Sequence, residues 1–175
     1  MTTTVSSAQA ALVNLAPCNG AALSQPFLPW ADPSSYELAP GGDFESAAWS
    51  AHNGAQLVSG GDPYSASGSA ATALLLPAGA WAQSPSTCVD AAYPTIRFFI
   101  AGSGSVAVEV VAGGLVIPAG IAIATGQWTP SPIMMTGAAL AGAFSGGTAS
   151  VSLRIVALTG DPRVDDVYID PWNRG

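Results

Sequence analysis

The sequence predicts an all-β protein, an antiparallel β-sandwich in which short strands alternate with turns. Its 20 glycines and 14 prolines follow no regular period and separate short apolar runs, which is typical of β-proteins rich in turns. Apolar residues make up 49% of the chain and charged residues only 9%, a composition that excludes a disordered chain. Turn signals recur about every 8–12 residues, the spacing of a sandwich or jelly roll.

We divide the 175 residues into an extended N-terminal segment, 1–40, and one β-sandwich domain, 41–175. Residues 1–16 are rich in Thr, Ser and Ala and fit either a short helix or an added edge strand. Residues 17–40 hold five prolines and predict an extended segment that lies across the sandwich.

Within the domain, the predicted strands follow one another between turns marked by Gly, Pro, Asn and Asp. They cover residues 44–49, 55–58, 70–76, 80–83, 95–101, 106–111, 115–117, 121–124, 150–158 and 163–171. Residues 128–135 contain Pro130 and Pro132 and predict an edge segment. The segments 95–101, 106–111 and 150–158 alternate along the chain, so each buries one face. The residues expected to point inward are Val106, Val108 and Val110 in the second segment and Val151, Leu153, Ile155 and Ala157 in the third. We expect 44–49 and 163–171 to be neighbouring opening and closing strands.

The charge of the chain limits its partners. The chain has eleven acidic residues, four arginines and no lysine, and its net charge is −7. Without a basic cluster, neither nucleic acid nor an anionic membrane surface is an expected partner. The most apolar run, 106–124, is interrupted by Glu109, Gly113-Gly114 and Pro118 and predicts no membrane insertion. So few charges suit a homo-oligomer or a cell-surface setting.

The two cysteines, Cys18 and Cys88, predict one disulfide and an oxidising compartment; the alternative is two buried thiols. Residues 1–5 lack the basic and apolar regions of a signal peptide. We therefore expect a secreted or cell-surface protein whose signal peptide is absent from this sequence. One histidine and two isolated cysteines offer no metal-ligand spacing.

A candidate ligand face follows from strand alternation. Its residues share the outward parity of their strands: Arg97, Phe99, Glu109 and Arg154. Trp81 and Trp128 lie beside turns with proline or glycine and are the tryptophans best placed to stack on a sugar; Trp128 is assigned to the ligand face. The alternative for any of the five tryptophans is a place in the core. The alternative for the whole face is an ordinary solvated surface with cross-strand Arg–Glu pairs.

Two short motifs carry a resemblance. The chain opens its domain with Gly-Asp-Phe-Glu at 42–45 followed by Trp49, and closes it with Val-Asp-Asp-Val-Tyr-Ile-Asp at 164–170. This pair resembles the galactose-binding-domain-like jelly rolls, which include many carbohydrate-binding modules. The whole chain is also similar to a group of uncharacterised exported actinobacterial proteins, a similarity that brings no function.

The jelly-roll resemblance implies a structural Ca²⁺ at the edge between the first and last strands. The matching residues are Glu45, Asp165 and Asp166, with main-chain carbonyls near 41–43 completing the shell. If Val167 and Ile169 face the core, Asp165 points with them and is the better ligand. The alternative is that Arg163 or Arg154 pairs with these acids and no metal binds.

Signals for an enzyme are weak. The single histidine, His52, lies in the turn His-Asn-Gly, and no Gly-x-Ser-x-Gly motif is present. We therefore expect a non-catalytic extracellular binding module, specific for carbohydrate and carrying a structural calcium ion. The alternative is a self-assembling or structural cell-surface protein.

Overall fold

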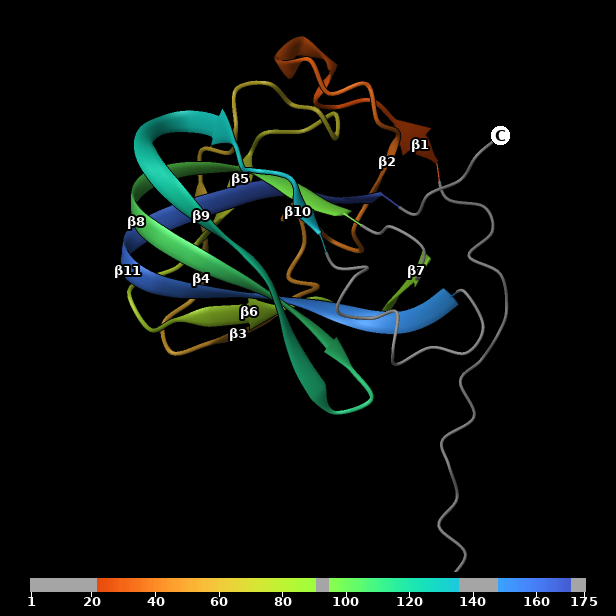
Figure 1. The fold of residues 1–175 in the computed structure, drawn as a ribbon. Helices are drawn as coiled ribbons and strands as arrows, with labels where there is room; N and C mark the ends of the chain where they lie inside the picture. The colour runs from red at the N-terminus through yellow and green to blue at the C-terminus, as the bar shows by residue number, and fades with distance from the viewer. Residues whose placement is uncertain (1–21, 91–94, 136–147, 171–175) are drawn as a thin grey trace, which may run out of the picture.

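A computed structural model of the chain describes residues 22–90, 95–135 and 148–170 (Figure 1). The expectations for residues 1–16 and for Cys18 lie outside the described residues. The elements are β1 (Leu23–Ser24), η1 (Leu28–Trp30, a 3-10 turn), β2 (Tyr36–Leu38), β3 (Ser50–His52), β4 (Gln56–Ser59), β5 (Thr72–Leu75), β6 (Trp81–Gln83), β7 (Thr87–Asp90), β8 (Thr95–Ala112), β9 (Leu115–Pro130), β10 (Met134–Met135) and β11 (Thr148–Asp170). The predicted all-β antiparallel sandwich is confirmed.

Three long strands, β8, β9 and β11, run through both halves of the sandwich (Figure 1). In one half the order is β4-β5-β11-β8-β9, with β5 paired to β11 at Arg163 and Val164. In the other half the order is β3-β6-β11-β8-β9, with β6 paired to β11 between Arg154 and Val156. Each long strand therefore contributes side chains to both halves.

The core lies between the two halves and is built by alternate residues of the long strands. Val106, Val108 and Val110 of β8 are at most 1% exposed, and so are Val151, Leu153 and Ile155 of β11. Burying a side chain of this size stabilises the fold by about 1.5–3 kcal/mol. The inward parity that the sequence predicts for these six residues is confirmed.

The long strands pass through glycines and a proline where the sequence predicts breaks between strands. Gly102, Gly104 and Gly160 adopt positive φ of 85°, 97° and 67° within the paired strands. A Cβ atom at Gly104 would overlap the backbone of Thr159, so the close approach requires glycine. Register shifts beside these residues absorb the irregularities, and two predicted strands merge into each of β8, β9 and β11.

The prediction of a strand over 44–49 is wrong. The chain forms turns there, with φ of 65° at Gly41 and 52° at Phe44, and β3 begins only at Ser50. Both aromatic residues of the motif instead enter the core, where the Phe44 and Trp49 rings lie 5.1 Å apart. The segment is still a neighbour of the closing strand, because the Val167 N–H donates to the Gly42 carbonyl at 3.0 Å.

Within the N-terminal segment, residues 22–40 lie across the outer face of the β8–β11 pair. β2 pairs with the end of β11, and Phe27 and Tyr36 pack on Phe99 and Tyr168 as a second buried cluster. The rings of Phe27 and Tyr36 meet edge to face at 5.1 Å. The described residues 22–40 therefore belong structurally to the sandwich.

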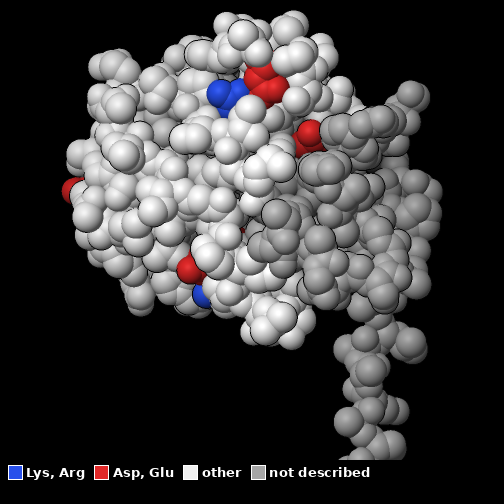
Figure 2. Space-filling model, in the orientation of Figure 1, with Lys and Arg blue, Asp and Glu red and all other residues white. Residues whose placement is uncertain are grey.

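Charged side chains are sparse on the surface, and the two basic groups on the viewed face each lie beside an acidic one (Figure 2). None of the described segments is a helix with the length and apolar character needed to cross a membrane. Cys88 lies on β7, opposite Ser150 of β11. Because Cys18 lies outside the described residues, the disulfide stays a prediction.

Candidate functional site

A bulge near the end of β11 positions two neighbouring carboxylates. Asp165 pairs with Phe99 of β8, but the next pair is Tyr168 with Arg97, so Asp166 and Val167 together lie opposite Phe98 and β11 carries one extra residue. Asp166 adopts a left-handed φ of 48°, a conformation that aspartate tolerates better than most residues. Both acidic side chains belong to residues that are 0% exposed.

Because of the bulge, the prediction that the Asp165 side chain points to the same side as Val167 is wrong. Val164, Val167 and Ile169 face the main core, while Tyr168 belongs to the second cluster. Asp165 lies opposite Phe99 and shares its outer face, because directly paired residues point to the same side of a sheet. It therefore does not share the core-facing parity of Val167.

A third carboxylate comes from the loop between β4 and β5. Asp62 is also 0% exposed, and its backbone N–H donates to Asp165 Oδ2 at 2.8 Å. A Cβ atom at Gly61 would overlap this same oxygen, so the preceding residue must be glycine. One oxygen from each of Asp62, Asp165 and Asp166 lies within 4.8 Å of the others. We call these three residues the acidic cluster.

Backbone donors satisfy only part of the acidic cluster. Asp165 Oδ1 accepts from the Asp166 N–H at 2.9 Å, Asp62 Oδ1 from Tyr64 at 2.8 Å, and Asp166 Oδ2 from Ser67 at 2.9 Å. Asp62 Oδ2 and Asp166 Oδ1 are buried without a hydrogen-bond partner. Two buried carboxylate oxygens without donors require a proton or a cation.

Burial dominates the electrostatics of the acidic cluster. Loss of solvation raises the pKa of Asp165 to about 8 and that of Asp166 to about 6, from an ordinary value of 3.8, and raises the pKa of Asp62 as well. Repulsion between the carboxylates adds to the shift for Asp165 and Asp166. The two ion pairs of the described residues, Arg97–Asp32 and Arg154–Glu109, do not involve these acids.

The residues of the acidic cluster fit a hard divalent cation. Calcium binds oxygen ligands at about 2.3–2.6 Å, so ligand oxygens within 4.8 Å of one another can share one ion. The unpartnered oxygens of Asp62 and Asp166 supply the donors that such an ion requires. Three carboxylates are too few for six to eight ligands, so carbonyls or water would complete the shell.

Glu45, which the sequence groups with Asp165 and Asp166, is not part of the acidic cluster. It is exposed, and its Oε1 accepts from the backbone N–H groups of Ala71 and Thr72 at 2.9 and 3.2 Å. These hydrogen bonds lower the pKa of Glu45. Glu45 therefore holds the far end of the β4–β5 loop, and the carboxylate that lies beside Asp165 and Asp166 is that of Asp62.

The sequence gives little indication of Asp62. It follows a Gly-Gly pair and precedes a proline, which reads as an ordinary turn. Its partner Asp165 is 103 residues away, and only tertiary structure brings the two together. The usable signal was the Gly60-Gly61 pair, which permits close approach of the backbone to another group.

The predicted ligand face is divided by the curvature of β8, and its first part is covered. Phe99 is 0% exposed beneath the N-terminal segment, so it cannot contact a ligand. The Arg97 side chain is 11% exposed; its Nη1 lies 2.7 Å from Asp32 Oδ2, and its guanidinium lies over the Phe27 ring. The assignment of Arg97 and Phe99 to a ligand face is therefore wrong.

The second part of the predicted face is a cross-strand ion pair. Arg154 Nη1 lies 3.4 Å from Glu109 Oε2, and Arg154 also donates to Gln83 Oε1 at 3.1 and 3.2 Å. Its guanidinium lies 4.9 Å from the Trp81 ring, which stacks on His52 at 3.7 Å. This arrangement matches the alternative of a solvated face with Arg–Glu pairs.

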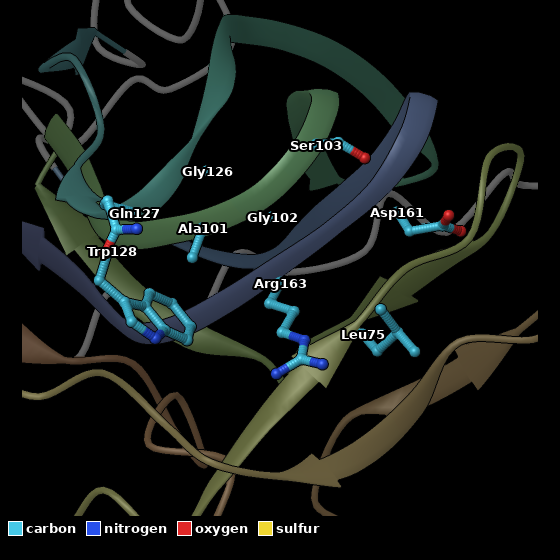
Figure 3. Close-up of a pocket in the computed structure, with 9 residues that line it drawn as sticks. All are labelled: Leu75, Ala101, Gly102, Ser103, Gly126, Gln127, Trp128, Asp161 and Arg163. Atoms are coloured by element: carbon cyan, nitrogen blue, oxygen red, sulfur yellow. The ribbon is translucent and has the colours of Figure 1, made fainter.

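Trp128 is half-buried: it packs against the second cluster and also lines an open groove of about 550 Å³ (Figure 3). Four adjacent strands line the groove: Gly126, Gln127 and Trp128 of β9, Ala101, Gly102 and Ser103 of β8, Asp161 and Arg163 of β11, and Leu75 of β5. Gly102 pairs with Gly126 in the floor, so the middle of the groove lacks side chains. Figure 3 shows Trp128, Arg163 and Leu75 projecting into the same open region.

The groove and the acidic cluster adjoin along β11. Asp161, Arg163 and Asp165 pair in turn with Ser103, Ala101 and Phe99, so their side chains share one face. The β4–β5 loop joins the two sites, because Tyr64 donates its hydroxyl to the Trp128 carbonyl at 2.9 Å. Tyr64 also packs on Phe99 at 5.0 Å, only two residues from Asp62.

Comparisons with known proteins support the fold. No protein-family description matches the chain, and no curated protein matches it. Among solved structures, the CBM22-1–GH10 modules of a Clostridium thermocellum xylanase, solved with xylohexaose, match with a TM-score of 0.50 and 12% identity, over 72% of this chain and 26% of that chain. This similarity shows a shared β-sandwich fold.

Other similar solved structures are also carbohydrate-binding modules. A CBM61 module in complex with β-1,4-galactotriose has a TM-score of 0.47 and 16% identity, over 74% of this chain and 94% of that chain. The C-terminal CBM6 of a Zobellia galactanivorans laminarinase has a TM-score of 0.47 and 14% identity, over 73% and 94%. The predicted similarity to exported actinobacterial proteins is not shown by these comparisons.

Proposed function

We propose that the protein is a non-catalytic, extracellular carbohydrate-binding module whose ligand lies in the groove beside Trp128. The observation that carries this proposal is the Trp128 ring. Among the described residues it has no stacking or cation partner, whereas Trp81 stacks on His52. The indole is half-buried, because it packs against the second cluster, but it also lines the groove. An indole that lines a groove beside polar side chains is the combination that sugar binding needs, since a sugar ring has both apolar faces and hydroxyl edges.

The other groove residues provide hydrogen bonds for hydroxyl groups. All three polar side chains are exposed and line the groove: Ser103, Gln127 and Asp161. The Asp161 carboxylate can accept hydrogen bonds from sugar hydroxyls, and the Gln127 amide can both donate and accept them. The glycine floor leaves room for a flat ring along the strands. The shared fold with the xylanase modules agrees with this proposal, but the groove residues carry it.

The proposal includes a structural calcium ion held by Asp62, Asp165 and Asp166. The ion would neutralise the acidic cluster and tie the β4–β5 loop to β11. That loop carries Tyr64, whose hydroxyl bonds the backbone of Trp128. A bound ion would thus support the end of the groove without touching the saccharide.

Trp128→Ala is expected to weaken saccharide binding by about thirtyfold, corresponding to about 2 kcal/mol for loss of a central aromatic contact. The measurement is a glycan-array screen in calcium and in chelator, followed by calorimetric titration of the strongest hit. Trp81→Ala is the matched control and should leave the affinity within about twofold, because Trp81 lies outside the groove.

Two results would contradict the groove assignment. Equal loss of affinity in both tryptophan variants would indicate a general structural effect. Loss only in Trp81→Ala would place the saccharide on the face that carries Arg154 and Glu109. If no glycan on the array binds, either in calcium or in chelator, at protein concentrations where weak modules respond, the proposed carbohydrate-binding function is wrong.

A second candidate function, self-association at a cell surface, is favoured by β9. Its Leu115, Ile121 and Ile123 side chains are 60%, 57% and 67% exposed, and β9 pairs only with β8 among the described strands. This candidate predicts a mass above 17.4 kDa by light scattering at high concentration, and return to a monomer in Ile123→Lys. A monomeric wild-type protein at all concentrations would exclude it.

A further inference from the structure

Arg163 differs from the other arginines of the described residues. Arg97 and Arg154 each bond a carboxylate, at 2.7 and 3.4 Å. Arg163 is exposed, and within the described part of the chain its side chain donates no hydrogen bond and forms no ion pair. Its side chain projects into the groove on the same side as Trp128 (Figure 3).

A guanidinium that has no partner among the described residues, beside an indole that lines the same groove, suits an anionic ring. Arginine presents planar N–H donors that match both oxygens of a carboxylate, and such charge-assisted bonds are about twice as strong as neutral ones. A hexuronic acid carries its carboxylate on a ring that can stack on an aromatic residue. Resting on the proposed function, we propose that the groove selects a saccharide with a hexuronic acid unit, whose carboxylate binds Arg163 while the sugar stacks on Trp128.

The remaining charges limit how many acidic units the groove accepts. Asp161 lies two residues before Arg163 on the same face of β11, about 7 Å away along the strand. Its carboxylate accepts hydrogen bonds from sugar hydroxyls but repels a second uronate. The net charge of −7 adds repulsion for polyanions at low salt. We therefore expect the ligand to be a saccharide that carries one uronic acid unit and is otherwise neutral, and we expect a polyuronate to bind poorly.

The test uses oligosaccharides that carry one glucuronic or galacturonic acid, each beside its carboxyl-reduced counterpart, with calorimetric titration of the full chain in calcium. We expect the acidic form to bind at least tenfold more tightly, the ratio that a charge-assisted hydrogen bond provides. Arg163→Gln should bind both forms alike, and Arg163→Lys should keep part of the preference. Arg154→Gln, outside the groove, is the matched control and should keep all of it.

The outcomes separate this inference from the proposed function. Equal or tighter binding of the carboxyl-reduced forms, with Trp128→Ala still weakening both, overturns the uronic acid preference alone. A preference that persists in Arg163→Gln overturns the role of Arg163. Absence of binding by every acidic and reduced saccharide contradicts both proposals. Because Arg163 is exposed, thermal unfolding of Arg163→Gln should match wild type and exclude misfolding.

Discussion

Asp165→Ala is expected to lower the free energy of unfolding by about 2–6 kcal/mol, measured by chemical denaturation at pH 7 in chelator. Asp165 accepts from the backbone N–H groups of Asp62 and Asp166, which are both 0% exposed. Alanine leaves both donors buried without an acceptor, and each unsatisfied group costs about 1–3 kcal/mol. The bond from Asp62 joins β11 to a loop that lies 103 residues earlier, and the bond from Asp166 holds the bulge itself.

Two further variants make this result specific. Asp161→Ala removes an exposed acid from the same strand and should change the free energy of unfolding by less than about 0.5 kcal/mol. Asp165→Asn keeps one acceptor and should fall between alanine and wild type. If Asp165→Ala unfolds like Asp161→Ala, the hydrogen bonds of the acidic cluster do not hold the loop, and our account of the bulge is wrong.

Calcium is expected to reverse the pH dependence of stability. Burial raises the pKa of Asp165 to about 8 and that of Asp166 to about 6, both above the ordinary 3.8. Between pH 4 and 8 the metal-free folded protein therefore binds protons that the unfolded chain has released. These groups contribute stability that is present below pH 4 and is lost as pH rises through 6 to 8. Each pKa unit corresponds to about 1.4 kcal/mol, so the loss should reach a few kcal/mol.

Thermal unfolding at pH 5 and pH 8, in chelator and in millimolar calcium, measures this linkage. Calcium binds the ionised carboxylates, so the rise in melting temperature should be larger at pH 8 than at pH 5. Asp62→Asn, which removes one oxygen donor of the cluster, should reduce the calcium effect. A melting temperature at pH 8 that calcium leaves unchanged would contradict the calcium site. In that case protons, rather than a calcium ion, neutralise the acidic cluster.

The fold was predictable because strand alternation is a local signal. The inward residues of β8 and β11 follow from period-two patterns in 106–111 and 150–158. The merging of neighbouring strands was not predictable, because Gly102, Gly104 and Pro162 mark turns in most sequences. Here the positive φ of the glycines and the register shifts keep the strands paired through these positions.

The candidate site was only partly predictable. The Asp165-Asp166 pair was found from its motif, but Asp62 reaches it across the sandwich and has no fixed spacing from it. Strand parity placed Arg97 and Phe99 outward correctly, yet it could not reveal that Phe27 and Tyr36 cover that face. Trp128 was identified by its neighbouring proline, whereas only the structure reveals that the Arg163 side chain has no ion-pair partner among the described residues.

Saccharide binding beside Trp128 is tested most directly by a two-dimensional ¹H–¹⁵N titration that follows the tryptophan indole N–H signals. The five tryptophans give few peaks, and Phe substitutions assign those of Trp128 and Trp81. On addition of the strongest saccharide from the array, the Trp128 signal should shift progressively to saturation while the Trp81 signal stays in place. A shift of Trp81 with Trp128 unchanged would move the ligand to the opposite half of the sandwich and contradict the account.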